Sequence, residues 1–151
     1  MPGATLSSEE NRALIRRLYE EAINRQDAVA AAGFYAPDAK NHGRLVGRAG
    51  MQAVFEALFS TFPDFNYRIE EMTAEGDRVV CKVTMQGTHR GQPTLPHAFS
   101  GMLTGVAPTG KPVRVLQFHS FRIGGGKISE HAAVRDDLGM LLQLGLLQLP
   151  G

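Results

Sequence analysis

The clearest pattern of apolar and polar positions in this chain lies between Val113 and Ile123. Side chains alternate there with a period of two, which predicts a β-strand, and the glycines at 124–126 predict a turn into a second strand. One face of this strand is apolar at both ends and carries Gln117 and His119 side by side in the middle. Because a polar group in a dry core needs a partner, this face suits the wall of a closed pocket.

The opposite face of the same strand carries Leu116 and Phe118 between charged ends. These two side chains make it too apolar for open water, which predicts that a second layer or a second subunit covers it. We therefore expect a homodimer formed through the outer face of the sheet.

The first part of the chain has helical periodicity. Ser7 and Glu10 have capping-box spacing, and a helix is expected from there to about Arg25. Asp27 can cap a second, short helix, and a third follows the segment 47–50 and ends at Pro63. The apolar stripes of the first and third helices are Leu14, Ile15, Leu18, Tyr19, Ala22 and Ile23, and Val54, Phe55, Leu58, Phe59 and Phe62.

After Asp64 the periodicity changes from helical to alternating. Residues 65–69 and 79–85 predict a hairpin, a fourth strand is expected at 97–104, and residues 138–149 predict a C-terminal helix or tail held in a core or interface. Helices followed by long strands indicate an α+β fold with the helices on one face of a curved sheet. Such packing leaves a conical pocket.

Length and charge limit the classes of protein. The 151 residues predict a single domain, 1–151, with residues 1–6 as a loose arm. The net charge of +1 gives no indication of nucleic acid or of an anionic membrane surface as a partner. One cysteine, no basic and apolar leader and no membrane-length apolar run predict a cytoplasmic protein.

Several short motifs occur in a characteristic order. They are FPDF at 62–65, GTHRG at 87–91, PTGKPVRV at 108–115, FRIGGGKISEH at 121–131 and DDLGMLLQLG at 136–145, with KNH ending at His42. Together they resemble the SnoaL-like polyketide cyclase family of the nuclear transport factor 2-like superfamily. The resemblance implies a cone-shaped α+β barrel with a curved antiparallel or mixed sheet, a cofactor-free site inside the cone and, commonly, a dimer formed through the sheet.

The resemblance also implies a chemistry. Cyclases of the family close a ring by intramolecular aldol condensation with an aspartate and a histidine, and His119 with Gln117 matches the polar pair expected on the penultimate strand. Family sequences often carry a tryptophan-aspartate pair directly after the EH motif, where this chain has Ala132 and Ala133. The nearby carboxylates are Asp136 and Asp137.

The catalytic assignment follows from the needs of an aldol addition: a base, enolate donors and an acid. The base is assigned to Asp136 or Asp137, with Glu130 as the alternative, and His119 is the acid or enolate donor. Gln117 orients the substrate carbonyl. The other residues expected to bind substrate are Tyr19, His42, Phe55, Phe62 and His131.

Some of these residues can instead have a purely structural role. His119 can be a core histidine bonded to a backbone carbonyl, and His42 can be a surface strand end. The helical aromatic stripe that holds Phe55 and Phe62 is most often plain core. His89 and His97 are expected in loops or at the rim.

The hairpin register decides which residues of the last strand join His119. A three-residue loop pairs Ile123 with Lys127 and brings the set His131, Ala133, Arg135 and Asp137 to that face. A four-residue loop pairs Ile123 with Ile128 and brings Glu130, Ala132, Val134 and Asp136 instead. Asp137 also stands where the N-cap of a C-terminal helix belongs. The sequence leaves both registers open.

No cofactor motif is visible. The triple glycine lies in a hairpin turn rather than in a phosphate loop after a strand, and no short-spaced set of metal ligands occurs. We therefore expect no metal, flavin or nicotinamide, and a small hydrophobic or aromatic molecule as ligand. The leading hypothesis is a polyketide cyclase; the alternatives are a cofactor-independent polyketide hydroxylase and a non-catalytic binding protein.

Overall fold

A computed structural model describes residues 5–94 and 101–151. Within these residues six strands form one curved sheet in the order β2-β1-β6-β5-β4-β3, and β1 runs parallel to β6 while all other neighbours are antiparallel. The predicted mixed sheet is therefore confirmed. The strands are β1 (Tyr35–Asn41), β2 (Arg44–Leu45), β3 (Asn66–Glu75), β4 (Arg78–Thr88), β5 (Pro112–Gly124) and β6 (Lys127–Arg135).

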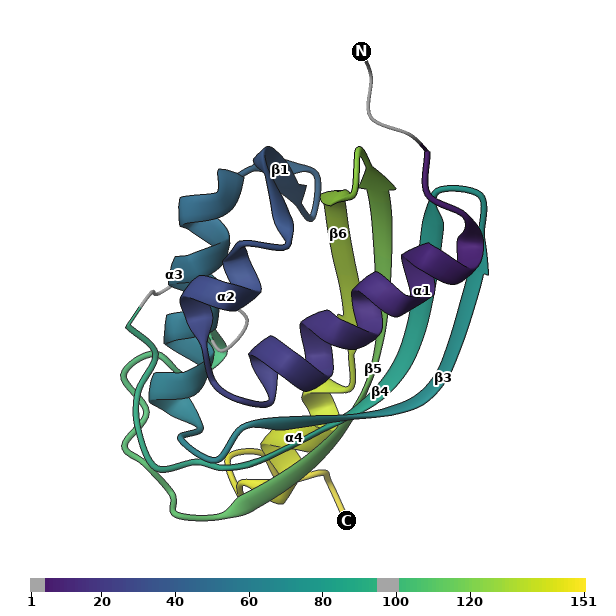
Figure 1. Cartoon of the computed structure of the whole chain (residues 1–151). Coiled ribbons are helices and arrows are strands. Elements are labelled where there is room, and N and C mark those ends of the chain that lie inside the picture. The colour runs from purple at the N-terminus through teal and green to yellow at the C-terminus, as the bar shows by residue number, and fades with distance from the viewer. Residues whose placement is uncertain (1–4, 95–100) are drawn as a thin grey trace.

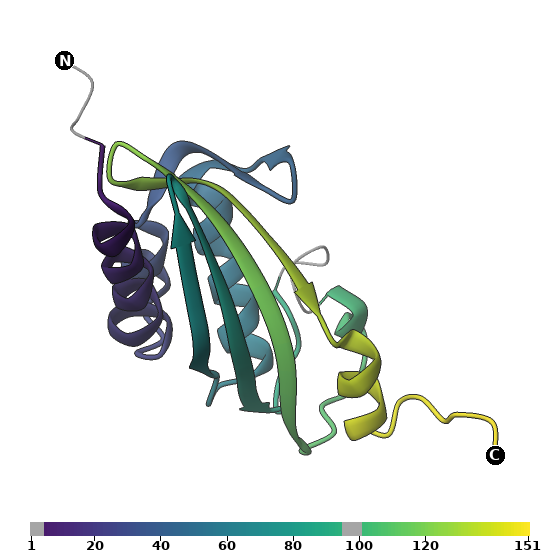
Figure 2. The ribbon, with the colours of Figure 1, turned by 90° about the vertical axis from the view of Figure 1, so that its right-hand side faces the viewer.

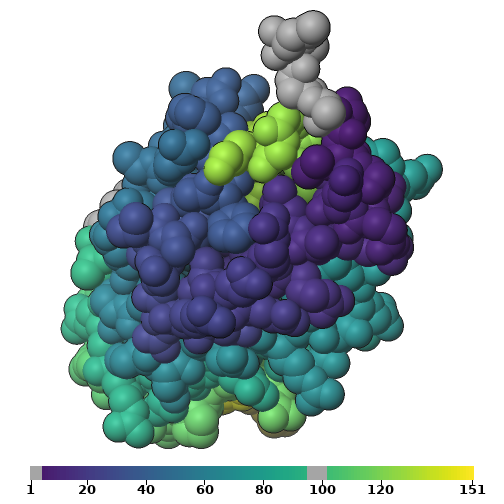
Figure 3. Space-filling view, in the orientation of Figure 1, coloured from purple at the N-terminus to yellow at the C-terminus, as the bar shows by residue number. Residues whose placement is uncertain are grey.

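Helices cover one face of this sheet (Figure 1). The view turned by 90° shows the sheet curving beside them (Figure 2), and their side chains hide most of the sheet in the space-filling view (Figure 3). This is the α+β architecture expected from the sequence. The helices on this face are α1 (Ser8–Arg17), which continues as the π-helix η1 (Leu18–Ile23), α2 (Ala28–Ala32) and α3 (Gly47–Thr61).

The predicted starts of the first two helices are confirmed. The Ser7 hydroxyl accepts a hydrogen bond from the Glu10 N–H, and the Glu10 carboxylate accepts one from the Ser7 N–H, so the capping box is complete. The Asp27 carboxylate accepts from the Ala30 N–H at 2.9 Å and caps α2. The apolar stripe of the first helix is buried against the sheet.

A wide turn interrupts the first helix, which the sequence pattern did not predict. In η1 the Asn24 N–H donates to the Tyr19 carbonyl, five residues earlier, at 2.8 Å. The Asn24 side chain then pairs in both directions with the backbone of Tyr67 on β3, each bond 2.8 Å long. These contacts fasten the end of the helix to the sheet.

The β5–β6 hairpin combines the two predicted registers. At the turn Ile123 pairs with Ile128, as the four-residue alternative requires, but Ser129 is an extra residue and Arg122 pairs with Glu130. Beyond this bulge the residues that share the face of His119 are His131, Ala133 and Arg135, as in the three-residue alternative. Neither register alone was right, because one bulged residue changes the parity of the strand.

Three expectations for loops and termini need correction. Residues 101–103 form the 3-10 turn η2 (Gly101–Leu103) instead of the end of a fourth strand, and residues 95–100, with His97, lie outside the described residues, as do residues 1–4 of the expected arm. The last helix, α4 (Asp137–Gln143), is shorter than predicted. Its N-cap is Asp136, whose carboxylate accepts from the Gly139 N–H at 2.9 Å, and not Asp137.

The C-terminal segment is also less buried than expected. Met140 and Leu144 are buried, but Leu146 and Leu149 are exposed. The Gln143 side chain pairs with the backbone of Arg114 and so joins α4 to β5. In the ranges 5–94 and 101–151, no helix is both long and apolar enough to cross a membrane.

Candidate functional site

A pocket of about 250 Å³ lies between the helices and the inner face of the sheet. Its walls are largely aliphatic and aromatic, and the polar groups among the described residues gather on β1, β3, β5 and β6. The lining residues are Leu18, Tyr19, Ile23, Tyr35, Asn41, His42, Met51, Val54, Phe55, Leu58, Tyr67, His119, Phe121, His131, Ala133 and Arg135.

Four side chains form a continuous polar row, three of them on the pocket floor and Gln117 directly behind it. His119 Nε2 lies 2.8 Å from Gln117 Oε1, and His119 Nδ1 lies 2.8 Å from His131 Nε2. His131 Nδ1 lies 2.8 Å from Asn41 Oδ1, and the Tyr67 hydroxyl donates to Gln117 Oε1 at 3.1 Å. Every ring nitrogen of the two histidines is therefore engaged.

Counting hydrogens in this row links its protonation state to the orientation of the two amides. Each of the three contacts from Gln117 to Asn41 needs one hydrogen, and when both amides present oxygen all three must come from the imidazoles. Two neutral imidazoles carry only two, so this amide orientation fits a histidine pair that shares one positive charge. A neutral pair needs one amide to turn its NH₂ toward a ring.

Asn41 is the amide that can turn. It is only partly buried and lines the pocket, whereas Gln117 is fully buried and also accepts the Tyr67 hydroxyl. In the neutral pair the Asn41 NH₂ would donate to His131 Nδ1, and adding a proton at that nitrogen would turn the amide oxygen toward it.

The surroundings favour the neutral histidines. Burial, then the neighbouring His42 and Arg135, lower the pKa of His131 to about 3. Burial, followed by His131 and Arg135, lowers the pKa of His119 well below its ordinary value. At neutral pH both rings are therefore free bases.

His42 stands at the rim. It has a left-handed backbone conformation (φ 52°) after β1, its ring lies edge-on to His131 with centroids 6.0 Å apart, and its side chain lines the pocket. Partial burial and, secondarily, Arg135 lower its pKa. Within the described part of the chain neither nitrogen of His42 has a hydrogen-bond partner, so this imidazole can meet a ligand directly.

The structure places the predicted substrate-binding residues as follows. Tyr19, His42, Phe55, His119 and His131 line the pocket. Gln117 lies behind the lining and holds His119. Phe62 is fully buried against Phe65 and His89 outside the lining, and so packs as core.

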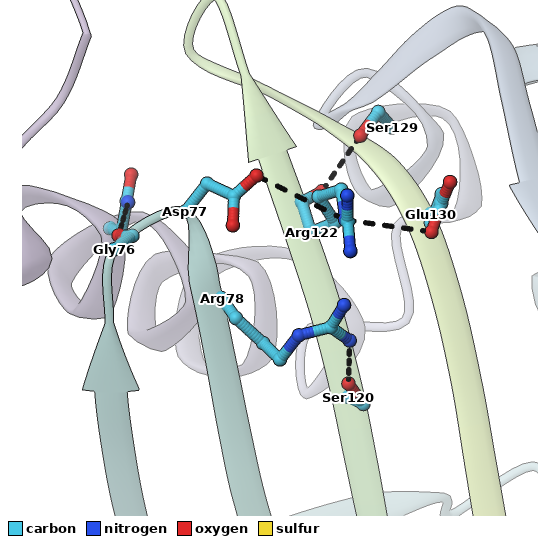
Figure 4. A network of polar contacts seen from close by, with 8 residues as sticks. Gly76, Asp77, Arg78, Ser120, Arg122, Ser129 and Glu130 are labelled. Carbon is cyan, nitrogen blue, oxygen red and sulfur yellow. Dashed lines mark hydrogen bonds and ion pairs between the residues drawn. The ribbon is translucent and has the colours of Figure 1, made fainter.

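The three carboxylates proposed as the base do not line the pocket. Glu130 lies on the outer face, where Arg122 pairs with it at 3.6 Å and with Asp77 at 4.0 Å (Figure 4). Asp136 is exposed and caps α4. Asp137 forms an ion pair with the lining residue Arg135 at 3.3 Å, which makes it the only one of the three in contact with a pocket side chain.

Sequence reasoning missed several lining residues, among them Tyr67 and Asn41, and it named Arg135 only as part of the three-residue register. Asn41 was visible in the KNH motif but was passed over in favour of the adjacent histidine. Tyr67 and Arg135 lie on alternating strands, and only the register shows that they face His119.

His89 lies in the loop directly after β4, as predicted. Its side chain is fully buried, and its Nδ1 accepts from the Thr109 N–H at 3.2 Å. It ties the end of β4 to the segment before β5. No group of three or more His, Cys, Asp or Glu side chains within residues 5–94 and 101–151 is placed to hold a metal ion.

The chain matches the model of a known protein family. The model of the SnoaL-like polyketide cyclase family matches residues 13–144. A comparison with curated proteins gave no match.

Solved structures agree with this fold. AclR from Streptomyces galilaeus, a candidate hydroxylase, is 29% identical over 94% of this chain and 100% of its own, with a TM-score of 0.77. IdmH from Streptomyces antibioticus, a candidate polyketide cyclase, is 29% identical over 89% of this chain and 98% of its own, with a TM-score of 0.71. TsrD from Streptomyces laurentii, at 24% identity over 94% and 99% of the two chains and a TM-score of 0.79, supports the fold alone.

Proposed function

Because the chain belongs to the SnoaL-like polyketide cyclase family, we propose that its pocket closes a ring in a polyketide-type small molecule by intramolecular aldol addition. The observation that carries this proposal is the row of Asn41, His131, His119 and Gln117 along the floor of a pocket whose walls are largely aliphatic and aromatic. It provides a neutral base whose protonated form has acceptors in the Gln117 oxygen and, once the amide has turned, the Asn41 oxygen.

The base in this proposal is the histidine pair. Asn41 turns away from His131 Nδ1, which then removes a proton from a carbon flanked by two carbonyls. The pair can share the added charge between His119 Nδ1 and His131 Nε2, while the oxygens of Gln117 and Asn41 accept the two outer N–H groups. When the pair is protonated, each of its outer N–H groups therefore has a hydrogen-bond acceptor.

The remaining steps need no net change in protons. The enolate attacks a carbonyl carbon of the same molecule, a carbon–carbon bond forms, and the proton returns from the histidine pair to the new alkoxide. Arg135 and the His42 N–H, both at the pocket surface, would stabilise the developing negative charge. That charge raises the pKa of the pair in the transition state, which compensates for its low pKa in the free protein.

This scheme changes the role of the carboxylates. Asp137 partly neutralises the positive charge of Arg135 through their ion pair and does not act as the base. Ala133 lies opposite His119 in the hairpin, at the position where the resemblance predicts an aspartate. The imidazole pair takes over the proton transfer there.

Incubation with a linear aromatic polyketide that carries an activated methylene and an aldehyde tests this function. Ring closure gives a product isomeric with the substrate, detected by chromatography and mass spectrometry. Unchanged substrate with the wild-type protein, under conditions in which it binds, would contradict the proposal and favour a binding protein.

A second candidate is a cofactor-independent hydroxylase, in which the same enolate adds dioxygen and the histidine pair returns its proton to give a hydroperoxide. Reduction of this hydroperoxide to the hydroxyl group and water takes two electrons from an external reductant such as a thiol. The similarity to AclR, which equals the similarity to IdmH in identity, and the alanine at position 133 favour the hydroxylase. Consumption of oxygen together with a product heavier than the substrate would identify this reaction.

A further inference from the structure

The Tyr19 hydroxyl is a buried polar group without a partner. Tyr19 is 1% exposed and lines the pocket, yet within the described ranges no atom forms a hydrogen bond with its oxygen. Proteins seldom leave a buried hydroxyl unpaired, because desolvation costs free energy that only a hydrogen bond recovers. A group of this kind in a pocket indicates a ligand atom as the missing partner.

The local fold holds this hydroxyl in place. Tyr19 belongs to the π-helix η1, and wide turns of this kind are frequent at functional sites. Its ring packs edge-on against Tyr67, His119 and Phe121, with centroid distances of 5.1, 6.1 and 6.1 Å. Asn24, which anchors η1 to β3, prevents the turn from relaxing. The hydroxyl is therefore positioned before a ligand arrives.

The groups around Tyr19 limit which kind of ligand atom can pair with its hydroxyl. Burial raises the pKa of Tyr19 well above its ordinary value, so the phenol stays protonated and can donate. Arg135 is a cation in the lining, and no Asp or Glu side chain of the described residues lines the pocket. A hydrogen-bond donor in a pocket with positive charge suits an acceptor oxygen with partial negative charge, such as that of a ketone or its enolate.

We propose that the Tyr19 hydroxyl binds the ketone oxygen of a planar aromatic ligand and makes the pocket select oxygenated rings over plain hydrocarbons. This inference rests on the proposed function, in which that ketone becomes the enolate. A site built to hydrogen-bond an oxygen discriminates strongly against an analogue that lacks it.

A matched pair of probes tests the selection without turnover. The ketone 9-fluorenone and the hydrocarbon fluorene have the same ring frame, and their dissociation constants are measured with the wild-type protein and with Tyr19→Phe. We expect the wild-type protein to prefer fluorenone, and the variant to bind fluorenone about five- to tenfold more weakly with fluorene unchanged. The carbonyl stretching band of bound fluorenone should shift to higher wavenumber in the variant.

A stability measurement separates a ligand contact from a structural one. Without ligand, Tyr19→Phe should be at least as stable as the wild-type protein, whereas Tyr67→Phe should be less stable because its hydroxyl bonds Gln117. An unliganded Tyr19→Phe protein that is clearly destabilised would overturn the inference. So would unchanged fluorenone affinity in Tyr19→Phe, or failure of both probes to bind the wild-type protein.

The two proposals fail in different ways. If the wild-type protein binds fluorenone through Tyr19 but never cyclises a polyketide, the selection holds and the proposed reaction is wrong. If cyclisation occurs and Tyr19→Phe keeps the preference for fluorenone, the reaction holds and the assignment of Tyr19 is wrong.

Discussion

Polar groups on the two faces of β5 and β6 have opposite surroundings: they are buried on the inner face and solvated on the outer face. On the inner face His119 is 5% exposed and Gln117 is fully buried, and their polar atoms depend on one another. On the outer face Arg122 and Glu130 meet in a solvated ion pair, while Phe118 is 46% exposed. Exposed ion pairs contribute little to stability, whereas a buried polar group left without a partner is costly. Substitutions on the inner face should therefore have larger effects.

The largest expected effect is on turnover at His119. His119→Ala removes half of the proposed base and should lower the rate of ring closure by about a hundred- to ten-thousandfold while the protein stays folded and binds ligand. The adjacent outer-face variant Phe118→Ala should turn over at the wild-type rate. Equal rates for both variants, measured with the polyketide substrate, would remove His119 from the mechanism.

The second-largest effect on turnover is expected at Asn41, which ends the polar row next to His131. Asn41→Asp places a carboxylate beside His131 Nδ1 and should raise the pKa of the pair by about one to two units. The acid limb of the pH–rate profile should move to higher pH by the same amount, and ¹⁵N NMR should show His131 protonated on Nδ1. A profile that does not move would mean that the pair does not titrate in catalysis.

The buried histidines also predict how stability depends on pH. Their pKa values are lowered in the folded protein, so below about pH 6.5 the unfolded chain takes up protons that the folded chain refuses. Stability should be constant between about pH 7 and 8 and fall on acidification, by up to about 1.4 kcal/mol per pH unit for each histidine. Urea unfolding between pH 7.5 and 5.5 measures the slope, which His131→Gln should reduce; an identical slope would contradict this origin.

A smaller effect is expected from the carboxylates. Asp137→Asn should change turnover several-fold through Arg135, while Asp136→Asn and Glu130→Gln should keep the wild-type rate, because these side chains lie outside the pocket. A loss of a hundredfold or more in any of the three would return the role of base to a carboxylate.

The smallest effect on activity is expected on the outer face. Leu116, Phe118 and Val134 are 43%, 46% and 77% exposed there, and the homodimer predicted from the sequence would cover them. Phe118→Lys should convert a dimer to monomers in sedimentation velocity while ring closure continues. A wild-type protein that is monomeric at micromolar concentration would refute the dimer.

Much of the fold followed from local patterns. The capping box at Ser7, the cap at Asp27 and the alternation through β3, β4 and β5 depend on residues close in sequence, so the sequence alone predicted them. The π-turn at 18–23 could not be predicted, because the apolar stripe fits an ordinary helix and the wide turn depends on the contact between Asn24 and Tyr67.

The site was predictable only in part. His119 and Gln117 stood out because amide and imidazole interrupt an apolar strand face, and both proved to be buried at the pocket. Their partners His131 and Asn41 come from β6 and β1, and only the register of the strands brings them together. Glu130 lies on the outer face because the parity of β6 changes at one residue, whereas Asp136 and Asp137 lie beyond the strand, at the start of α4.

The bulge at Ser129 gives this protein an unusual route of change. Straightening the bulge without a change in chain length would leave Ile128 in place and shift every later residue of β6 by one position, to the opposite face. Glu130, Ala132 and Val134 would then form the pocket wall, and a carboxylate would enter near the position that histidine holds now. Deleting Ser129, in contrast, would keep Glu130 opposite Arg122 and His131 opposite Phe121, so the same wall would remain. A slip of one residue would thus replace the whole wall of a site at once, which stepwise point substitutions in a lineage could reach only through several intermediates.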